Sequence, residues 1–203
     1  WKKKETYAKM QGRVGCSDLS KISYSGRIRF ALYSEPLASD ITIDYIQVAR
    51  KLLPNSEIDV ITNGDYLNKK MLNKLVDAGL DVLRISVYPK GYVWDKDEAH
   101  IQIGKISRRL GIEPELVSES RSNISWRYPH SKLIIKAGAK DIATTGLDRG
   151  ESMPELTDKL YKRKSPCSMV FTHFNIYSDG AVTPCCNIRN DHPEHKDYII
   201  GYL

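Results

Sequence analysis

EIDVITNGDYLNKKMLNKLVDAGLDVLRISVY, residues 57–88, reads as a strand, a helix and a second strand. The first strand runs into the Asn63-Gly64 pair, which is typical of a turn. Asn68 is expected to cap the start of the helix, and Gly79 is placed to end it. The last eight residues are apolar on both faces, as in a strand buried within a parallel sheet. This unit predicts parallel strands joined by a helical crossover.

The same alternation continues on both sides of this unit. Residues 40–53 place apolar side chains along one helical stripe, and Pro54 stops that helix. The further elements expected are a strand at 27–33, a helix at 40–53, a helix at 96–110 and a strand at 114–119. The resulting β-α-β-α-β-α-β order predicts an α/β fold, either an α/β barrel or a doubly wound sheet.

The last third of the chain differs in composition. Residues 121–165 read as irregular, and a strand is expected over residues 168–177. We therefore expect residues 1–165 to form the core domain and residues 166–203 to form a small cysteine-bearing extension. The chain starts without a methionine and ends on a strand-like run, so we expect a fragment of a longer protein.

Composition narrows the class of protein. With 203 residues, 41% of them hydrophobic, the chain is long enough to bury a core. Lysine and arginine outnumber the acids 31 to 25, but no nucleic-acid recognition motif accompanies them, so nucleic-acid binding is not expected. No apolar run approaches the roughly 20 residues of a membrane span. We expect a cytoplasmic protein without a membrane partner.

Polar residues follow three successive predicted strands. In folds of this class, ligands bind at the carboxyl ends of the strands. Taken singly, these residues also suit a solvated loop, a generic turn and a crowded strand. The candidates for a cofactor-binding site are Ser34, Glu35, Pro36, Thr62, Asn63 and Ser86.

The order of these motifs resembles the radical S-adenosylmethionine superfamily. The matching segments are YSEPL, ITNG and AGLDVLRISV, all within residues 27–88. The stretch from Cys167 through Gly180 to Cys185 resembles the SPASM extension of that superfamily. The resemblance implies a partial (βα) barrel of the radical S-adenosylmethionine type, followed by the start of an auxiliary cluster domain.

The resemblance also implies a function. The family reduces S-adenosylmethionine with a [4Fe–4S] cluster, and the 5′-deoxyadenosyl radical takes a hydrogen atom from the substrate. Residues 34–36 are implied to follow the methionine amino group, and Thr62, Asn63 and Ser86 to complete the cofactor site. The implied partners are a peptide or small-molecule substrate and a reductant such as a flavodoxin or ferredoxin. No catalytic residue is identified.

The cysteines near the end of the chain are the candidate metal ligands. The resemblance implies that Cys167 and Cys185 ligate an auxiliary iron–sulfur cluster. Cys186 is either a third ligand or a buried small residue. Without the resemblance, the alternative is a zinc site in which His192 and His195 join the paired cysteines.

One departure from the family limits the expected activity. The family's CxxxCxxC loop is absent, and only Cys16 lies in that region. The chain as given is therefore not expected to cleave S-adenosylmethionine. Three hypotheses remain: a fragment of a radical enzyme, a non-catalytic iron–sulfur or zinc module on an α/β barrel, and an unrelated α/β barrel enzyme whose cysteine tail is structural.

Overall fold

The computed structural model describes residues 16–31, 34–90, 93–145 and 165–203. The chain divides into two compact units. One unit comprises residues 16–141, and the described part of the other comprises residues 142–145 and 165–203. None of the helices in the described ranges is long and apolar enough to cross a membrane.

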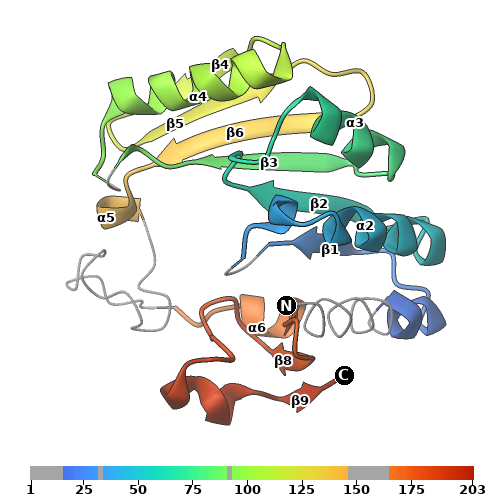
Figure 1. The fold of residues 1–203 in the computed structure, drawn as a ribbon. Helices are drawn as coiled ribbons and strands as arrows, with labels where there is room; N and C mark the ends of the chain where they lie inside the picture. Colours follow the sequence, from blue (N-terminus) through green and yellow to red (C-terminus); the bar gives the residue numbers. More distant parts are fainter. Residues whose placement is uncertain (1–15, 32–33, 91–92, 146–164) are drawn as a thin grey trace. The chain divides into compact units, whose positions relative to one another are not determined.

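A six-stranded sheet forms the centre of the larger unit (Figure 1). Its strands follow the order β1-β2-β3-β6-β5-β4. The first four are mutually parallel, β5 runs antiparallel to β6, and β4 runs antiparallel to β5. Their bounds are β1 Arg27–Phe30, β2 Glu57–Thr62, β3 Val82–Val87, β4 Glu115–Glu119, β5 Asn123–Tyr128 and β6 Ile134–Lys140.

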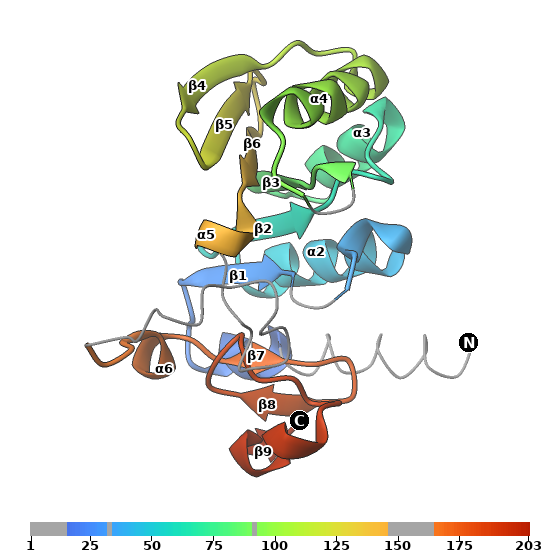
Figure 2. The ribbon, with the colours of Figure 1, turned by 90° about the vertical axis from the view of Figure 1, so that its left-hand side faces the viewer.

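Three helices pack on one side of this sheet (Figure 2). They are α2 (Ile41–Leu52), α3 (Lys69–Asp77) and α4 (Lys96–Leu110), and residues 16–21 are also helical. The helices and the sheet share one hydrophobic core. Its largest fully buried members include Tyr128, Ile46, Leu83 and Ile135.

Local chemistry explains the helix boundaries. The Asn68 side chain accepts a hydrogen bond from Met71 N at 2.9 Å, so it caps α3 as the sequence predicts. Asp95 caps α4 by accepting from the backbone N–H groups of Asp97 and Glu98. Gly111 ends α4 with a φ of 69°, a left-handed conformation that favours glycine.

The two faces of the sheet differ in chemistry because side chains alternate along each strand. The face toward the helices is apolar, with Val60 of β2 and Ile85 of β3 buried in the core. The opposite face is charged around Asp59, which accepts hydrogen bonds from Arg29 and Arg84.

The smaller unit is built from short elements. They are α5 (Ile142–Thr145), α6 (Met169–Thr172), β7 (Asn175–Ile176), β8 (Ala181–Thr183), the 3-10 helix η4 (Pro193–Tyr198) and β9 (Gly201–Tyr202). The three strands form an antiparallel sheet in the order β7-β8-β9. Gly180 turns the chain between β7 and β8 with a φ of 87°.

The structure confirms a mixed α/β fold with a mainly parallel sheet, but it does not confirm a partial barrel. Two predictions were wrong. Residues 121–165 are not all irregular, because β5 and β6 lie there and β6 pairs directly with β3. Residues 168–177 are not one strand, because α6 replaces its first half. The domain boundary near residue 165 stays a prediction, since residues 146–164 lie outside the described ranges.

Candidate cofactor-binding site

The carboxyl ends of β1, β2 and β3, together with the residues that follow them, are called the strand exits here. These exits meet at one edge of the sheet, and the predicted site residues lie along this edge. Thr62, the last residue of β2, is opposite Ile85 of β3. Asn63 and Ser86 each follow one of these paired residues on adjacent strands, and Ser86 in turn is opposite Gly138 of β6. Sheet register therefore brings together exits that are separated by 23 or more residues in sequence.

Glu35 joins the first exit to the second. Thr62 Oγ1 donates a hydrogen bond to Glu35 Oε1 at 2.6 Å, and Asn63 N donates to Glu35 Oε2 at 2.8 Å. Glu35 Oε1 also accepts from Leu37 N at 3.0 Å. Both carboxylate oxygens are thus used inside the protein. Glu35 is half-buried, and its geometry suits a residue that positions the exits rather than one that binds a ligand directly.

The segment around Pro36 is anchored to the first helix. Glu35 caps the short 3-10 helix η1 (Pro36–Ala38), and Pro36 is buried. The Thr42 hydroxyl of α2 donates to the Pro36 carbonyl at 2.5 Å. Ser34, which precedes this anchored segment, is exposed and so lies where a ligand at the edge can reach it.

The turn after β2 is fixed from two directions. Within the turn, Asp65 N donates to Asn63 Oδ1 at 2.9 Å, and Gly64 N donates to Thr62 Oγ1 at 3.0 Å. From α4, Arg109 Nη2 donates to the Gly64 carbonyl at 2.6 Å. Gly64 has a φ of 82°, and a Cβ added there would lie 2.9 Å from Ile106 Cδ1. The turn is therefore held by hydrogen bonds within it and from α4, and Gly64 has little room for a larger side chain.

Sequence reasoning missed the residues that support the edge from outside it. Thr42 and Arg109 lie on helices, 6 and 45 residues from their acceptors. No local motif marks either of them. Asp59 did carry a signal, because a charged residue inside the apolar run EIDVIT calls for a buried partner.

The chemistry of these groups fits part of S-adenosylmethionine. The cofactor presents an ammonium group and ribose hydroxyls, which need hydrogen-bond acceptors. Ser34 is exposed and Ser86 is half-buried at the same edge, and their hydroxyls and carbonyls provide such acceptors. The Glu35 carboxylate does not fit as a direct ligand, because its oxygens already accept three hydrogen bonds. Cofactor binding by the six candidate residues stays a prediction.

Cys185 of the smaller unit has a local role in the turn after β8. Cys185 Sγ accepts from Asn187 N at 3.4 Å, and the Cys185 carbonyl accepts from Ile188 N at 3.2 Å. Partial desolvation of the sulfur raises the pKa of the Cys186 thiol above its usual range, and the nearby Cys185 and Cys167 raise it further. None of the chain's cysteines, all of which are described, forms a disulfide.

The rings of the two histidines proposed as zinc ligands are in contact, with centroids 4.6 Å apart and an interplanar angle of 36°. His195 is buried, and its Nδ1 accepts a hydrogen bond from Arg189 N at 2.9 Å. Across the described ranges, no group of three or more His, Cys, Asp or Glu side chains is placed to hold a metal ion. Neither an iron–sulfur cluster nor zinc is supported there.

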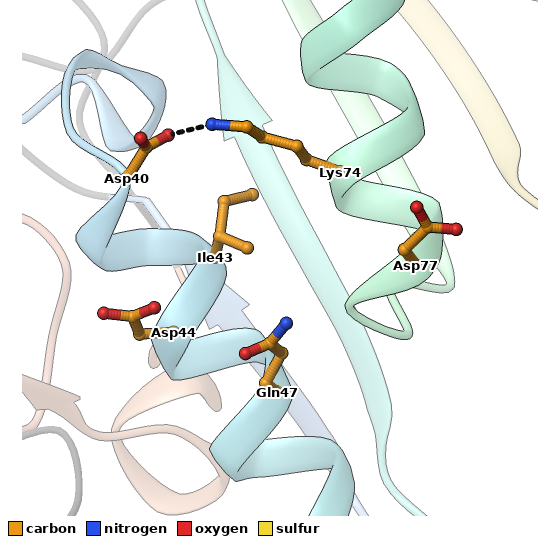
Figure 3. A pocket seen from close by; sticks show the side chains of 6 residues that line it. All are labelled: Asp40, Ile43, Asp44, Gln47, Lys74 and Asp77. Atoms are coloured by element: carbon orange, nitrogen blue, oxygen red, sulfur yellow. Dashed lines mark hydrogen bonds and ion pairs between the residues drawn. The ribbon is translucent and has the colours of Figure 1, made fainter.

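A surface depression of about 370 Å³ lies between α2 and α3 (Figure 3). The Asp40 and Lys74 side chains bridge it with an ion pair of 2.8 Å. It is lined by Asp40, Ile43, Asp44, Gln47, Lys74 and Asp77. It contains none of the residues predicted to bind a cofactor.

Comparison with known proteins gives distant matches. No family model matches the chain. The chain is 25% identical over 132 residues to an S-adenosyl-L-methionine-dependent 2-deoxy-scyllo-inosamine dehydrogenase from Niallia circulans, covering 58% of this chain and 52% of that protein. The chain thus spans about half the length of this curated relative.

Two solved structures share the fold. One is BtrN in complex with AdoMet and 2-DOIA, with a TM-score of 0.58, 16% sequence identity, and coverage of 98% of this chain and 63% of that one. The other is selenomethionine BtrN in an open conformation, with a TM-score of 0.50, 15% identity, and coverage of 98% and 60%. At these identities the likeness concerns the fold alone.

These findings overturn the identification as a radical S-adenosylmethionine protein with a SPASM extension. No family model supports it, and the curated relative is named as a dehydrogenase. Cys167, Cys185 and Cys186 are not grouped as metal ligands, and Cys185 instead accepts a backbone hydrogen bond within its own turn. The spacing of two cysteines around a glycine fits a strand-turn-strand hairpin equally well, which is why the pattern misled.

Proposed function

We propose that this chain binds S-adenosylmethionine at the carboxyl edge of its parallel sheet and belongs to an S-adenosylmethionine-dependent oxidoreductase. The main support for the proposal is that the Glu35 carboxylate, which follows β1, accepts hydrogen bonds from Thr62 and Asn63 at the end of β2. These bonds hold the two strand exits together. The similarity to an S-adenosyl-L-methionine-dependent dehydrogenase supports the cofactor, and the likeness to BtrN with AdoMet supports the fold.

The residues divide into two roles under this proposal. Ser34 and Ser86 hold the cofactor, because Ser34 is exposed and Ser86 is half-buried at the edge, whereas the half-buried Asn63 side chain bonds to Asp65 within its own turn. Glu35, Thr42 and Arg109 position the backbone that the cofactor contacts, since their polar atoms bond to protein groups. When bound and supplied with an electron by a reductant, S-adenosylmethionine would provide the oxidising chemistry. The protein fixes its position and keeps the strand exits in register.

Of the two substrate classes expected from sequence, we propose the small molecule. The name of the curated relative denotes a small-molecule dehydrogenase, and nothing in the comparisons supports a peptide. A flavodoxin or ferredoxin as reductant stays a prediction from sequence. The iron–sulfur cluster that the family would use finds no ligand set in the described ranges, so no step is derived through it.

Hydrogen–deuterium exchange on the full chain tests where S-adenosylmethionine binds. Saturating cofactor should slow exchange in residues 34–38 and 62–66 and around Ser86, while peptides from the outer surface of α2 stay unchanged. S-adenosylmethionine that protects α2 and α3 around the depression instead would contradict the proposed site.

A further inference from the structure

Three cationic side chains lie in one row across the face of the sheet opposite the helices. Arg127 of β5 is paired with Lys136 of β6, and Lys136 is paired with Arg84 of β3. Like charges directly opposite each other on neighbouring strands destabilise a sheet. A row of three such residues is therefore a surface that a bound anion would stabilise.

The protein compensates only part of that charge. Arg84 Nε donates to Asp59 Oδ2 at 2.9 Å. Among the described residues, no carboxylate forms an ion pair with Arg127 or Lys136, although Glu115 lies opposite Arg127 on β4. Both Arg127 and Lys136 are exposed. The positive charge of the row is thus directed toward solvent on this face.

Asp59 holds Arg84 in a defined orientation. The Asp59 side chain is 0% exposed, and its Oδ2 also accepts from Arg29 Nη2 at 2.6 Å. Within the described ranges, its Oδ1 has no hydrogen-bond partner. Because Asp59 engages Arg84 through Nε, the two Nη groups of Arg84 remain for another acceptor. The side chain of Arg84 is 32% exposed, so its outer edge is accessible.

A row of small residues lies beside the cations, closer to the carboxyl edge. Ser86 is paired with Gly138, and Gly138 is paired with Ser125. A Cβ at Gly138 would have only the Ile124 carbonyl within 4 Å, at 3.6 Å, so the sheet is not crowded there. Ser125 Oγ and Ser118 Oγ lie 2.7 Å apart. The surface between the cations and the cofactor edge is therefore low and polar.

We propose that this face binds the substrate through an anionic group, a carboxylate or a phosphate. Arg84 provides a planar fork suited to two oxygens of such a group, and Lys136 and Arg127 add charge beside it. Ser86 and Ser125 accept or donate hydrogen bonds to hydroxyl groups of the same molecule. The substrate class rests on the proposed function, because it places the molecule between the cations and the bound S-adenosylmethionine.

Matched ligands test this substrate class with the full chain. Glucose 6-phosphate, gluconate and glucose are titrated at constant ionic strength, and dissociation constants are measured by calorimetry or ligand-observed NMR. We expect at least one of the two anions to bind tenfold or more tightly than glucose. The Arg84→Gln/Lys136→Gln double variant should lose at least tenfold in that affinity. The charge-matched control Lys51→Gln/Lys105→Gln, on the exposed faces of α2 and α4, should stay within twofold.

Equal binding of glucose and both anions would overturn the anion site, as would an equal loss in the control variant. Circular dichroism checks that each variant is folded. S-adenosylmethionine affinity is measured on the same samples and should change less than threefold in the double variant. Anion binding without cofactor binding would refute the proposed function and leave the anion site standing. Cofactor binding without any preference for the anions would refute the anion site and leave the proposed function standing.

Discussion

Thr62 Oγ1 donates a 2.6 Å hydrogen bond to the Glu35 carboxylate across the exits of two parallel strands. The same carboxylate accepts from Asn63 N and Leu37 N. One side chain from the first exit therefore fixes the backbone of the second. This arrangement links the two strand ends and leaves both carboxylate oxygens occupied by protein donors.

Replacing Glu35 by glutamine should destabilise the protein. An amide has one acceptor oxygen, so its NH₂ group must face at least one of the donors that the carboxylate now accepts. We expect a loss of about 1–3 kcal/mol in the free energy of unfolding, measured by urea denaturation. The control Glu113→Gln, at an exposed position, should change it by less than about 0.5 kcal/mol. Equal effects in both variants would show that Glu35 does not join the exits.

Alanine substitutions at three glycines test how tightly Gly64 is packed in the turn after β2, with Gly104 and Gly111 as comparison positions. Gly104→Ala in α4 should stabilise by about 0.5–1 kcal/mol, because nothing lies within 4 Å of the new methyl group and alanine favours helix. Gly111→Ala should cost about 1 kcal/mol, because the φ of 69° is strained for alanine but space is open. Gly64→Ala combines strain with the contact to Ile106, so thermal unfolding should show the largest loss. A smaller loss at Gly64 than at Gly111 would refute the packed turn.

Asp59→Asn tests the buried acceptor on the charged face. The amide keeps the shape but removes the charge that Arg29 and Arg84 share, so we expect a loss of about 1–3 kcal/mol in unfolding free energy. The Asp40→Asn variant breaks only an exposed ion pair with Lys74 and should cost less than about 1 kcal/mol. An Asp59→Asn variant as stable as the wild type would show that the ion pairs of Asp59 with Arg29 and Arg84 do not stabilise the fold.

Because the pKa of Tyr45 is raised, we expect the protein to lose stability at alkaline pH. Burial, followed by the charge of Asp44, raises the pKa of Tyr45 to about 12. The folded protein keeps this proton while a tyrosine in the unfolded chain loses it near pH 10, so the unfolded state binds fewer protons in between. Stability should therefore fall as pH rises from about 10 to 12. Tyr45→Phe should remove part of this slope, and urea denaturation across that range measures it. An unchanged slope in Tyr45→Phe would assign the effect elsewhere.

The sequence predicted the elements whose signals are local. Residues 57–62 and 96–110 match β2 and α4, because a turn pair, polar caps and apolar periodicity mark their ends. The strands β5 and β6 were missed although Ile124, Trp126 and Tyr128 alternate with polar residues, a pattern that does indicate a strand. The pairing of β6 with β3 depends on contacts distant in sequence, and no local pattern reveals it.

The candidate site was predictable in the same uneven way. Parallel strands must end at a common edge, so the three exits could be grouped from sequence alone. The hydrogen bonds from Thr62 and Asn63 to the Glu35 carboxylate could not be predicted from sequence, because side-chain partners depend on packing. The cysteine pattern failed for the opposite reason. The same spacing also suits the β7-β8 hairpin, and Cys185 lies in the turn after β8, where its sulfur accepts a backbone hydrogen bond from Asn187.

Calorimetric titration of the full chain with S-adenosylmethionine tests the central claim most directly. We predict saturable binding with one site per chain, weakened at least threefold by Ser86→Ala and by Glu35→Gln. The matched control Gln47→Ala, in the depression between α2 and α3, should leave the affinity unchanged. A folded chain that shows no binding at millimolar S-adenosylmethionine, or binding that Gln47→Ala weakens and the edge variants do not, would contradict the account.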